Sequence, residues 1–235
     1  MSDCPEPMRT EQLEHLGIVA GIVDQLHLEE RVNECLGVHP QQSLSPGQGI
    51  KAMILNGLGF LSAPLYLYEG FFENKAVAHL LGDSVTAAHL NDDYLGRLLD
   101  KVWTYGVQEL FSLIAMDACR RFELTRERYH LDSTSIRVYG DYESKSESSQ
   151  DVPEVTYGYS KDHRGDLKQF ILETVCSSDG DVPLMLEVSS GNQCDKAVFA
   201  ERFKRFGQQW QLDGVMVADS ALYSADAPGW HRQFN

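Results

Sequence analysis

Two aspartates, Asp132 and Asp219, are the residues whose setting in this sequence indicates chemistry. Asp132 interrupts residues 128–139, a run of apolar and aromatic side chains that favours a half-buried strand. A carboxylate on a covered sheet face is costly unless it is hydrogen-bonded or binds a metal ion. The alternative is that Asp132 faces solvent or caps a local turn with the hydroxyl side chains that follow it.

Asp219 ends a short apolar run, and the elements between the two aspartates predict how they meet. We expect strands at residues 129–139, 169–176 and 182–188, a helix at 195–206, and a last strand at 215–220. The first three form an antiparallel meander with a tight turn at residues 177–181, and a helical crossover returns the last strand parallel to the first. Two close carboxylates repel each other, so a divalent cation bound between them would explain why both lie there. Alternatively, or in addition, Asp219 is the N-cap of a following helix.

Positive charge is concentrated just before the second strand, at Lys161, Arg164 and Lys168. These side chains are candidate phosphate contacts. The alternative is that these charges only keep the segment that leads into the second strand soluble. His163 lies among them as a possible general base, but the sequence identifies no partner for it.

The first half of the chain has helical periodicity. Residues 12–28 predict one amphipathic helix, and Ser45 with Gln48 forms a capping box at the start of another. Asn91 is the expected N-cap of a later helix, whose pattern breaks at Gly106. The histidines of this half lack metal-ligand spacing. We therefore predict an all-helical domain without chemistry of its own.

Composition limits the class of protein. The chain has 235 residues, 20 basic and 35 acidic, for a net charge of −15, which counts against nucleic-acid binding unless cations or clustered basic residues offset it. Five cysteines, with no Cys-x-x-Cys spacing and no apolar leader, predict a reduced, cytoplasmic protein. No run approaches the roughly 20 apolar residues of a membrane span.

Several motifs occur in an order that is specific when they are taken together. They are Ser45-Pro-Gly-Gln48, Leu55-Asn-Gly-Leu-Gly-Phe60, Pro64-Leu-Tyr66, His89-Leu-Asn-Asp-Asp93, His130-Leu-Asp-Ser-Thr134, Gly158-Tyr-Ser-Lys-Asp-His-Arg164 and Ala218-Asp-Ser-Ala-Leu-Tyr223. With these motifs the chain resembles the DDE transposases of bacterial insertion sequences. Within them it is most similar to the group of the IS-four superfamily that has a helical N-terminal domain of unknown function.

The resemblance implies a fold and a reaction. A tail (residues 1–10) and a helical N-terminal domain (11–125) would precede a partial RNase H-like catalytic domain (126–226), an α/β unit with an incomplete mixed sheet. Asp132 and Asp219 would be its first two catalytic carboxylates and would bind Mg²⁺ or Mn²⁺. Two such ions activate a water that cuts the transposon end, and then the freed 3′-hydroxyl that attacks target DNA. Transposon ends and target DNA are therefore the expected partners.

The sequence departs from this family at the third carboxylate. The family places it in a Tyr-x-x-Arg-x-x-x-Glu segment, but no glutamate follows Asp219, and residues 227–235 look unrelated, as if the reading frame had shifted. We expect a C-terminally truncated transposase that is inactive alone and prone to self-association through uncovered apolar surface. One alternative is a non-catalytic regulator that binds full-length transposase through the helical domain. Another is a hydrolase or nuclease that uses the same two aspartates differently.

Overall fold

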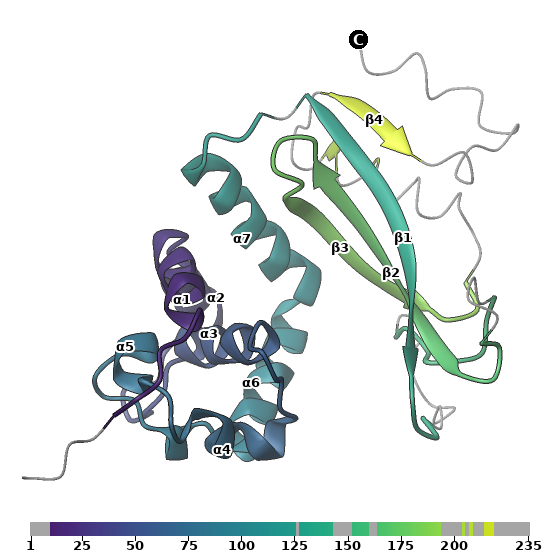
Figure 1. Ribbon diagram of the computed structural model, residues 1–235. Helices are drawn as coiled ribbons and strands as arrows, with labels where there is room; N and C mark the ends of the chain where they lie inside the picture. The colour runs from purple at the N-terminus through teal and green to yellow at the C-terminus, as the bar shows by residue number, and fades with distance from the viewer. Residues whose placement is uncertain are drawn as a thin grey trace, which may run out of the picture. The chain divides into compact units, whose positions relative to one another are not determined.

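The computed structural model describes residues 10–125, 127–142, 152–159, 164–193, 204, 207–208 and 214–218 (Figure 1). Over these residues a helical region precedes a β-sheet, which confirms the predicted order of the two regions. The chain divides into two compact units, here named the helical unit (residues 1–110) and the sheet unit (residues 111–235). No helix in the described part of the chain is long and apolar enough to cross a membrane.

The helical unit packs short helices around one apolar core. In chain order they are α1 (Leu16–Gln25), α2 (Leu28–Leu36), α3 (Pro46–Gly57), η1 (Leu65–Leu67), α4 (Tyr68–Phe72), α5 (Val77–Leu81), η2 (Ala87–His89) and α6 (Asp92–Tyr105). The core draws fully buried side chains from helices far apart in the sequence, including Leu16, Leu55, Phe72, Leu80 and Leu95. Burial of such side chains is the main stabilising contribution of this unit.

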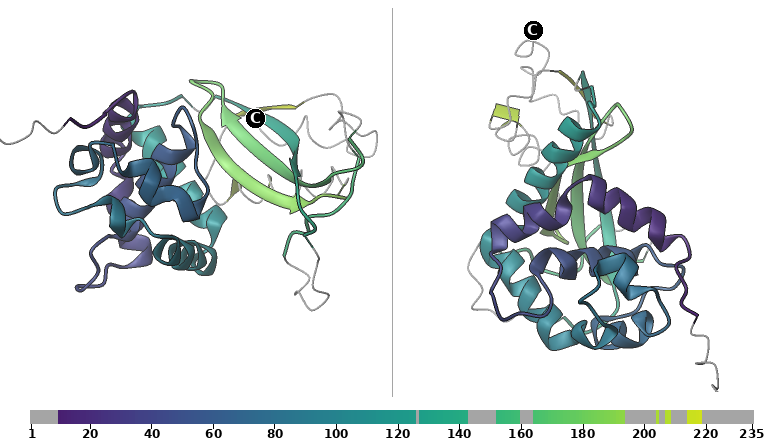
Figure 2. Two further views of the ribbon diagram at one scale, coloured as in Figure 1. Left: turned by 60° about the horizontal axis from the view of Figure 1, so that its bottom comes forward. Right: turned by 90° about the vertical axis from the view of Figure 1, so that its left-hand side faces the viewer.

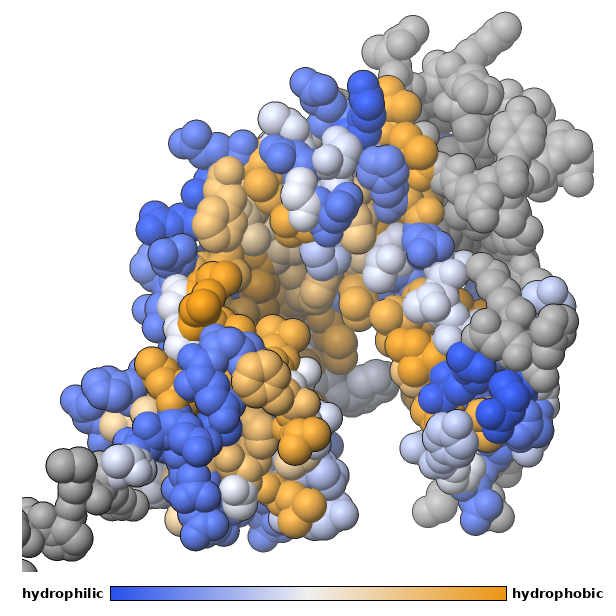
Figure 3. Space-filling view, viewed as in Figure 1, coloured by the Kyte–Doolittle hydropathy of each residue, from blue (hydrophilic) through white to orange (hydrophobic). Residues whose placement is uncertain are grey.

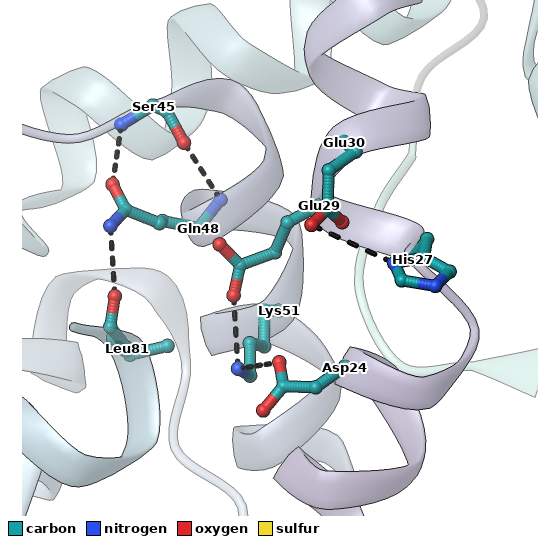
Figure 4. Close-up of polar contacts among 8 residues, drawn as sticks. All are labelled: Asp24, His27, Glu29, Glu30, Ser45, Gln48, Lys51 and Leu81. Atoms are coloured by element: carbon teal, nitrogen blue, oxygen red, sulfur yellow. Dashed lines mark hydrogen bonds and ion pairs between the residues drawn. The ribbon is translucent and has the colours of Figure 1, made fainter.

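The starts of α3 and α6 follow the capping signals of the sequence. The side chain of Ser45 accepts a hydrogen bond from the backbone N–H of Gln48, and the Gln48 side chain accepts one from the N–H of Ser45 (Figure 4). Asn91 accepts a hydrogen bond from the N–H of Tyr94 at 2.9 Å. Gly106, at φ 113°, ends α6, a conformation that favours glycine. The predicted capping box, N-cap and break are all confirmed.

The helix predicted over residues 12–28 is present but shorter than predicted at both ends, since α1 spans Leu16–Gln25. Helix α1 ends at Gln25 and α2 begins at Leu28, because His27 adopts a left-handed conformation with φ 52°. The break changes the chain direction, so that Asp24 before it and Glu29 after it both contact Lys51 of α3 (Figure 4). Tertiary contacts have here overridden an unbroken helical pattern.

Lys51 is a buried charge at the junction of these helices. Its side chain is 4% exposed and its Nζ lies 2.9 Å from Oε1 of Glu29 and also contacts Oδ1 of Asp24. Burial opposes the charged form of Lys51, but the hydrogen bonds to Asp24 and Glu29 outweigh it and raise its pKa. The ammonium group is therefore held charged inside the unit.

The sheet unit contains β1 (Arg128–Val138), β2 (Lys168–Ser177), β3 (Pro183–Ser190) and β4 (Val215–Ala218), in the order β3-β2-β1-β4. The long strands β1, β2 and β3 lie side by side and antiparallel (Figure 2). Strand β4 pairs with the first residues of β1 in parallel. The expected antiparallel meander is confirmed, and its strand ends fall within two residues of the predicted ones.

Helix α7 (Val107–Arg121) begins in the helical unit and packs against one face of the sheet in the sheet unit (Figure 2). The core between them contains Ala115, Cys119, Tyr129, Leu131, Val175, Leu184 and Met185. From its helical periodicity this segment was predicted to belong to the helical domain (residues 11–125). Its apolar residues from Phe111 onward instead complete the core of the sheet.

The connections of the sheet are described in part. The turn predicted at residues 177–181 is confirmed: Gly180 and Asp181 both have positive φ, and the N–H of Ser177 donates to the carbonyl of Val182 at 2.9 Å. Of the helix predicted at 195–206, only Lys204 lies within the described residues, and it is helical.

Candidate functional site

Asp132 lies near the middle of β1, on the face of the sheet opposite the α7 core. Along the strand Tyr129 and Leu131 are buried, whereas His130 and Asp132 between and after them are exposed. This period of two is the expected alternation of a strand with one covered face. Asp132 therefore faces solvent, as the alternative interpretation of the sequence anticipated. A carboxylate in that position is hydrated and accessible to a cation.

The carboxylate of Asp132 has a local hydrogen-bond donor. Its Oδ1 accepts a bond from the backbone N–H of Ser133 at 2.8 Å. This bond restricts the rotation of the side chain and leaves the group on the exposed surface of the strand. An oriented, exposed carboxylate is a suitable ligand for Mg²⁺ or Mn²⁺, which prefer oxygen ligands.

The strand register brings three further polar side chains to the same face. Thr174 of β2 lies directly opposite Asp132, and Cys176 lies opposite His130. Burial raises the pKa of the Cys176 thiol, and the negative charges of Asp181 and Asp132 raise it further. Sequence reasoning assigned no role to His130, Thr174 or Cys176. The period of two along β1 could have paired His130 with Asp132, but only the register identifies the two β2 residues.

Asp219 lies outside the residues that the structure describes, so the structure defines no distance from Asp132 to Asp219. The last described pair of the parallel ladder joins Leu131 of β1 to Ala218 of β4. These two residues immediately precede Asp132 and Asp219 in the sequence. Among the residues that the structure describes, no three His, Cys, Asp or Glu side chains are grouped so that they could hold a metal ion.

The candidate phosphate contacts Arg164 and Lys168 both have partners within the protein, whereas Lys161 and His163 lie outside the described residues. Arg164 binds Asp166 through Nε at 2.8 Å and through an Nη at 2.9 Å. This hydrogen-bonded pair lowers the pKa of Asp166 and raises that of Arg164.

Lys168 donates to the backbone carbonyls of Asp141 and of Tyr142, the latter at 2.8 Å, and its Nζ lies 6.0 Å from the ring centroid of Tyr157. These contacts hold the chain after β1 against the start of β2. A phosphate would have to compete with them, and with Asp166 at Arg164.

A close backbone crossing at the start of β2 was not anticipated. Thr156 pairs with Gln169, and a Cβ added to Gly158 would lie 1.8 Å from the carbonyl oxygen of Gly191. The buried side chain of Gln169 donates to the carbonyls of Tyr159 and Gly191 at 3.1 and 2.9 Å. Gly158 begins one of the motifs on which the family resemblance rests. Its role here is close backbone approach.

Comparison with known protein families finds a match in the helical part of the chain. Residues 8–116 match the family described as a domain of unknown function (DUF4277). No curated protein and no solved structure matches the chain.

Proposed function

We propose that the sheet unit is the catalytic part of a DDE transposase of bacterial insertion sequences, with an RNase H-like fold in which Asp132 and Asp219 are the first two metal-binding carboxylates. The observation that carries the proposal is the pairing of Leu131 with Ala218, the residues directly before the two aspartates. If the parallel ladder continues by one residue, the two carboxylates are neighbours at the end of β4. The match of residues 8–116 to a domain of unknown function supports the resemblance, which also expects such a domain.

The protein's own contribution to the reaction follows from this arrangement. Asp132 presents an exposed carboxylate that the N–H of Ser133 orients. Together with Asp219 it would hold Mg²⁺ or Mn²⁺, and the bound ions would supply Lewis-acid activation of a water or of a DNA 3′-hydroxyl. The two aspartates therefore position the cations, while DNA binding has to overcome the net charge of −15.

The 235-residue chain by itself is proposed to be inactive in DNA cleavage. Two carboxylates place a divalent cation less firmly than three, and no glutamate follows Asp219. The nucleotides downstream of the Asn235 codon can be translated in all three frames. A Tyr-x-x-Arg-x-x-x-Glu segment there would support the transposase proposal, and its absence from every frame would favour the regulatory alternative.

The metal site can be tested directly by Mn²⁺ binding to the purified full chain, measured by electron paramagnetic resonance of free Mn²⁺. We expect Asp132→Asn and Asp219→Asn each to weaken Mn²⁺ binding by at least about 10-fold, because each removes a ligand. Asp83→Asn is the matched control, since it removes one exposed carboxylate from the helical unit. Equal Mn²⁺ affinity of Asp132→Asn and Asp83→Asn would reject the proposed site.

A second candidate function is a non-catalytic regulator that associates through the helical unit. The observation that favours it is a set of strongly exposed apolar side chains on that unit, with Ile18 70%, Phe60 77% and Leu61 83% exposed. Figure 3 shows apolar surface over this part of the chain. Such exposure is typical of protein interaction surfaces.

This alternative predicts self-association of the chain that does not depend on metal. In sedimentation experiments, Phe60→Ser and Leu61→Ser should shift an oligomer to monomer, while Asp132→Asn should not. A wild-type chain that stays monomeric at high concentration would remove the support for association through this surface.

A further inference from the structure

His130 and Cys176 form a cross-strand pair that the proposed transposase chemistry does not use. His130 on β1 lies directly opposite Cys176 on β2 in the antiparallel register, so both side chains project from the same face of the sheet. His130 is exposed and Cys176 is half-buried. Cys176 is a free cysteine. Both groups are therefore accessible from solvent on one side.

The spacing of this pair fits two ligands of one metal ion. Directly opposite residues of antiparallel strands have Cβ atoms about 4.5–5.5 Å apart. A zinc ion forms bonds of about 2.3 Å to a cysteine sulfur and about 2.0–2.1 Å to a histidine nitrogen. Both side chains can therefore reach one ion without movement of the backbone. A thiolate with an imidazole selects Zn²⁺ and similar soft cations over Mg²⁺.

The surroundings of the pair are negatively charged. Asp132 follows His130 by two residues on the same face of β1, about 7 Å along the strand. Asp132 and Asp181 both act electrostatically on Cys176. Such charges raise the local concentration of cations.

We propose that His130 and Cys176 bind a thiophilic divalent cation such as Zn²⁺ on the exposed sheet face next to Asp132, with water completing the coordination. Two protein ligands on an exposed face make a weak, exchangeable site. The site depends on the strand register alone and does not require the transposase function.

The test is a Co²⁺ titration of the reduced, metal-free full chain, followed by the thiolate-to-cobalt charge-transfer absorption. We expect the wild-type chain to develop this band and Cys176→Ser to lose it. His130→Asn should weaken Co²⁺ binding by at least about 10-fold, as expected when one ligand is removed. Cys35→Ala is the matched control, because Cys35 is another free, half-buried cysteine, and it should leave the band and the affinity unchanged.

Three results would overturn the proposal. The first is a charge-transfer band that persists in Cys176→Ser, which would assign the thiolate to another cysteine. The second is an unchanged Co²⁺ affinity in His130→Asn, an exposed position where substitution leaves the core intact. Asp132→Asn should keep the cobalt band while it weakens Mn²⁺ binding. The proposed site at His130 and Cys176 and the proposed transposase site are therefore tested separately. Loss of the band in Asp132→Asn would overturn the two-ligand assignment.

Discussion

Replacement of Lys51 by alanine tests whether a buried ion pair joins the first three helices of the helical unit. The Lys51 side chain is 4% exposed and contacts Glu29, which is 22% exposed, and Asp24, which is 57% exposed. Lys51→Ala leaves the Glu29 carboxylate mostly buried without its cation. Breaking one partner of a buried pair costs about 3–5 kcal/mol. We expect about 3 kcal/mol, at the low end, because the more exposed Asp24 can be rehydrated.

The measurement is urea unfolding of the full chain, followed by the helical signal in circular dichroism. The variant should lower the urea midpoint at an unchanged slope of free energy against urea concentration. Glu34→Gln is the matched control, because it breaks the pair of Arg31 and Glu34, whose Glu34 side chain is 66% exposed. An exposed pair contributes about 0–1 kcal/mol, so this control should shift the midpoint far less.

A third variant separates the ion pair from simple loss of packing. Lys51→Met, combined with Asp24→Asn and Glu29→Gln, removes all three charges and keeps the side-chain volumes. Because no buried charge is left unpaired, this triple variant should be more stable than Lys51→Ala. The reasoning is refuted if Lys51→Ala shifts the midpoint no more than Glu34→Gln, or if the triple variant is less stable than Lys51→Ala.

Three further predictions follow from the geometry. The pKa of Lys51 is raised in the folded state, so protonation of Lys51 contributes fully to stability below pH 10.5, and this contribution is lost as the pH rises through the folded-state pKa. Burial raises the pKa of Tyr94 from 10.0, so ionisation of Tyr94 also lowers stability at high pH. Urea midpoints should therefore fall above pH 10.5, and less steeply in Lys51→Met; equal slopes would contradict this. Gly158→Ala should destabilise the sheet unit by about 1–3 kcal/mol, because its Cβ would lie 1.8 Å from a backbone oxygen. Gly165→Ala, with no atom within 4 Å of its Cβ, is the control, and equal thermal midpoints of the two variants would reject the reasoning. Ser45→Ala should cost about 1 kcal/mol in urea unfolding, because it removes the N-cap of α3, and no loss would mean that the capping box does not stabilise the helix.

Local signals predicted much of the fold. The capping box at Ser45, the N-cap at Asn91 and the break at Gly106 depend on residues within a few positions of each other, and all three were predicted. The strand limits and the turn at residues 177–181 followed from the period of two and from turn composition. The helix break at His27 did not, because the helical pattern runs through it and the contacts of Lys51 decide it.

The sequence by itself indicated Asp132 as a candidate site residue, since a carboxylate within a strand run is visible without any structure. Only the tertiary structure decided what surrounds it. The exposed face of β1, and the positions of Thr174 and Cys176 opposite Asp132 and His130, depend on the register between β1 and β2. That register is set by apolar packing against α7, since a shift of one residue would turn Tyr129 and Leu131 out of the core. No short-range pattern in the sequence contains this information, because the two strands are joined by a long connection.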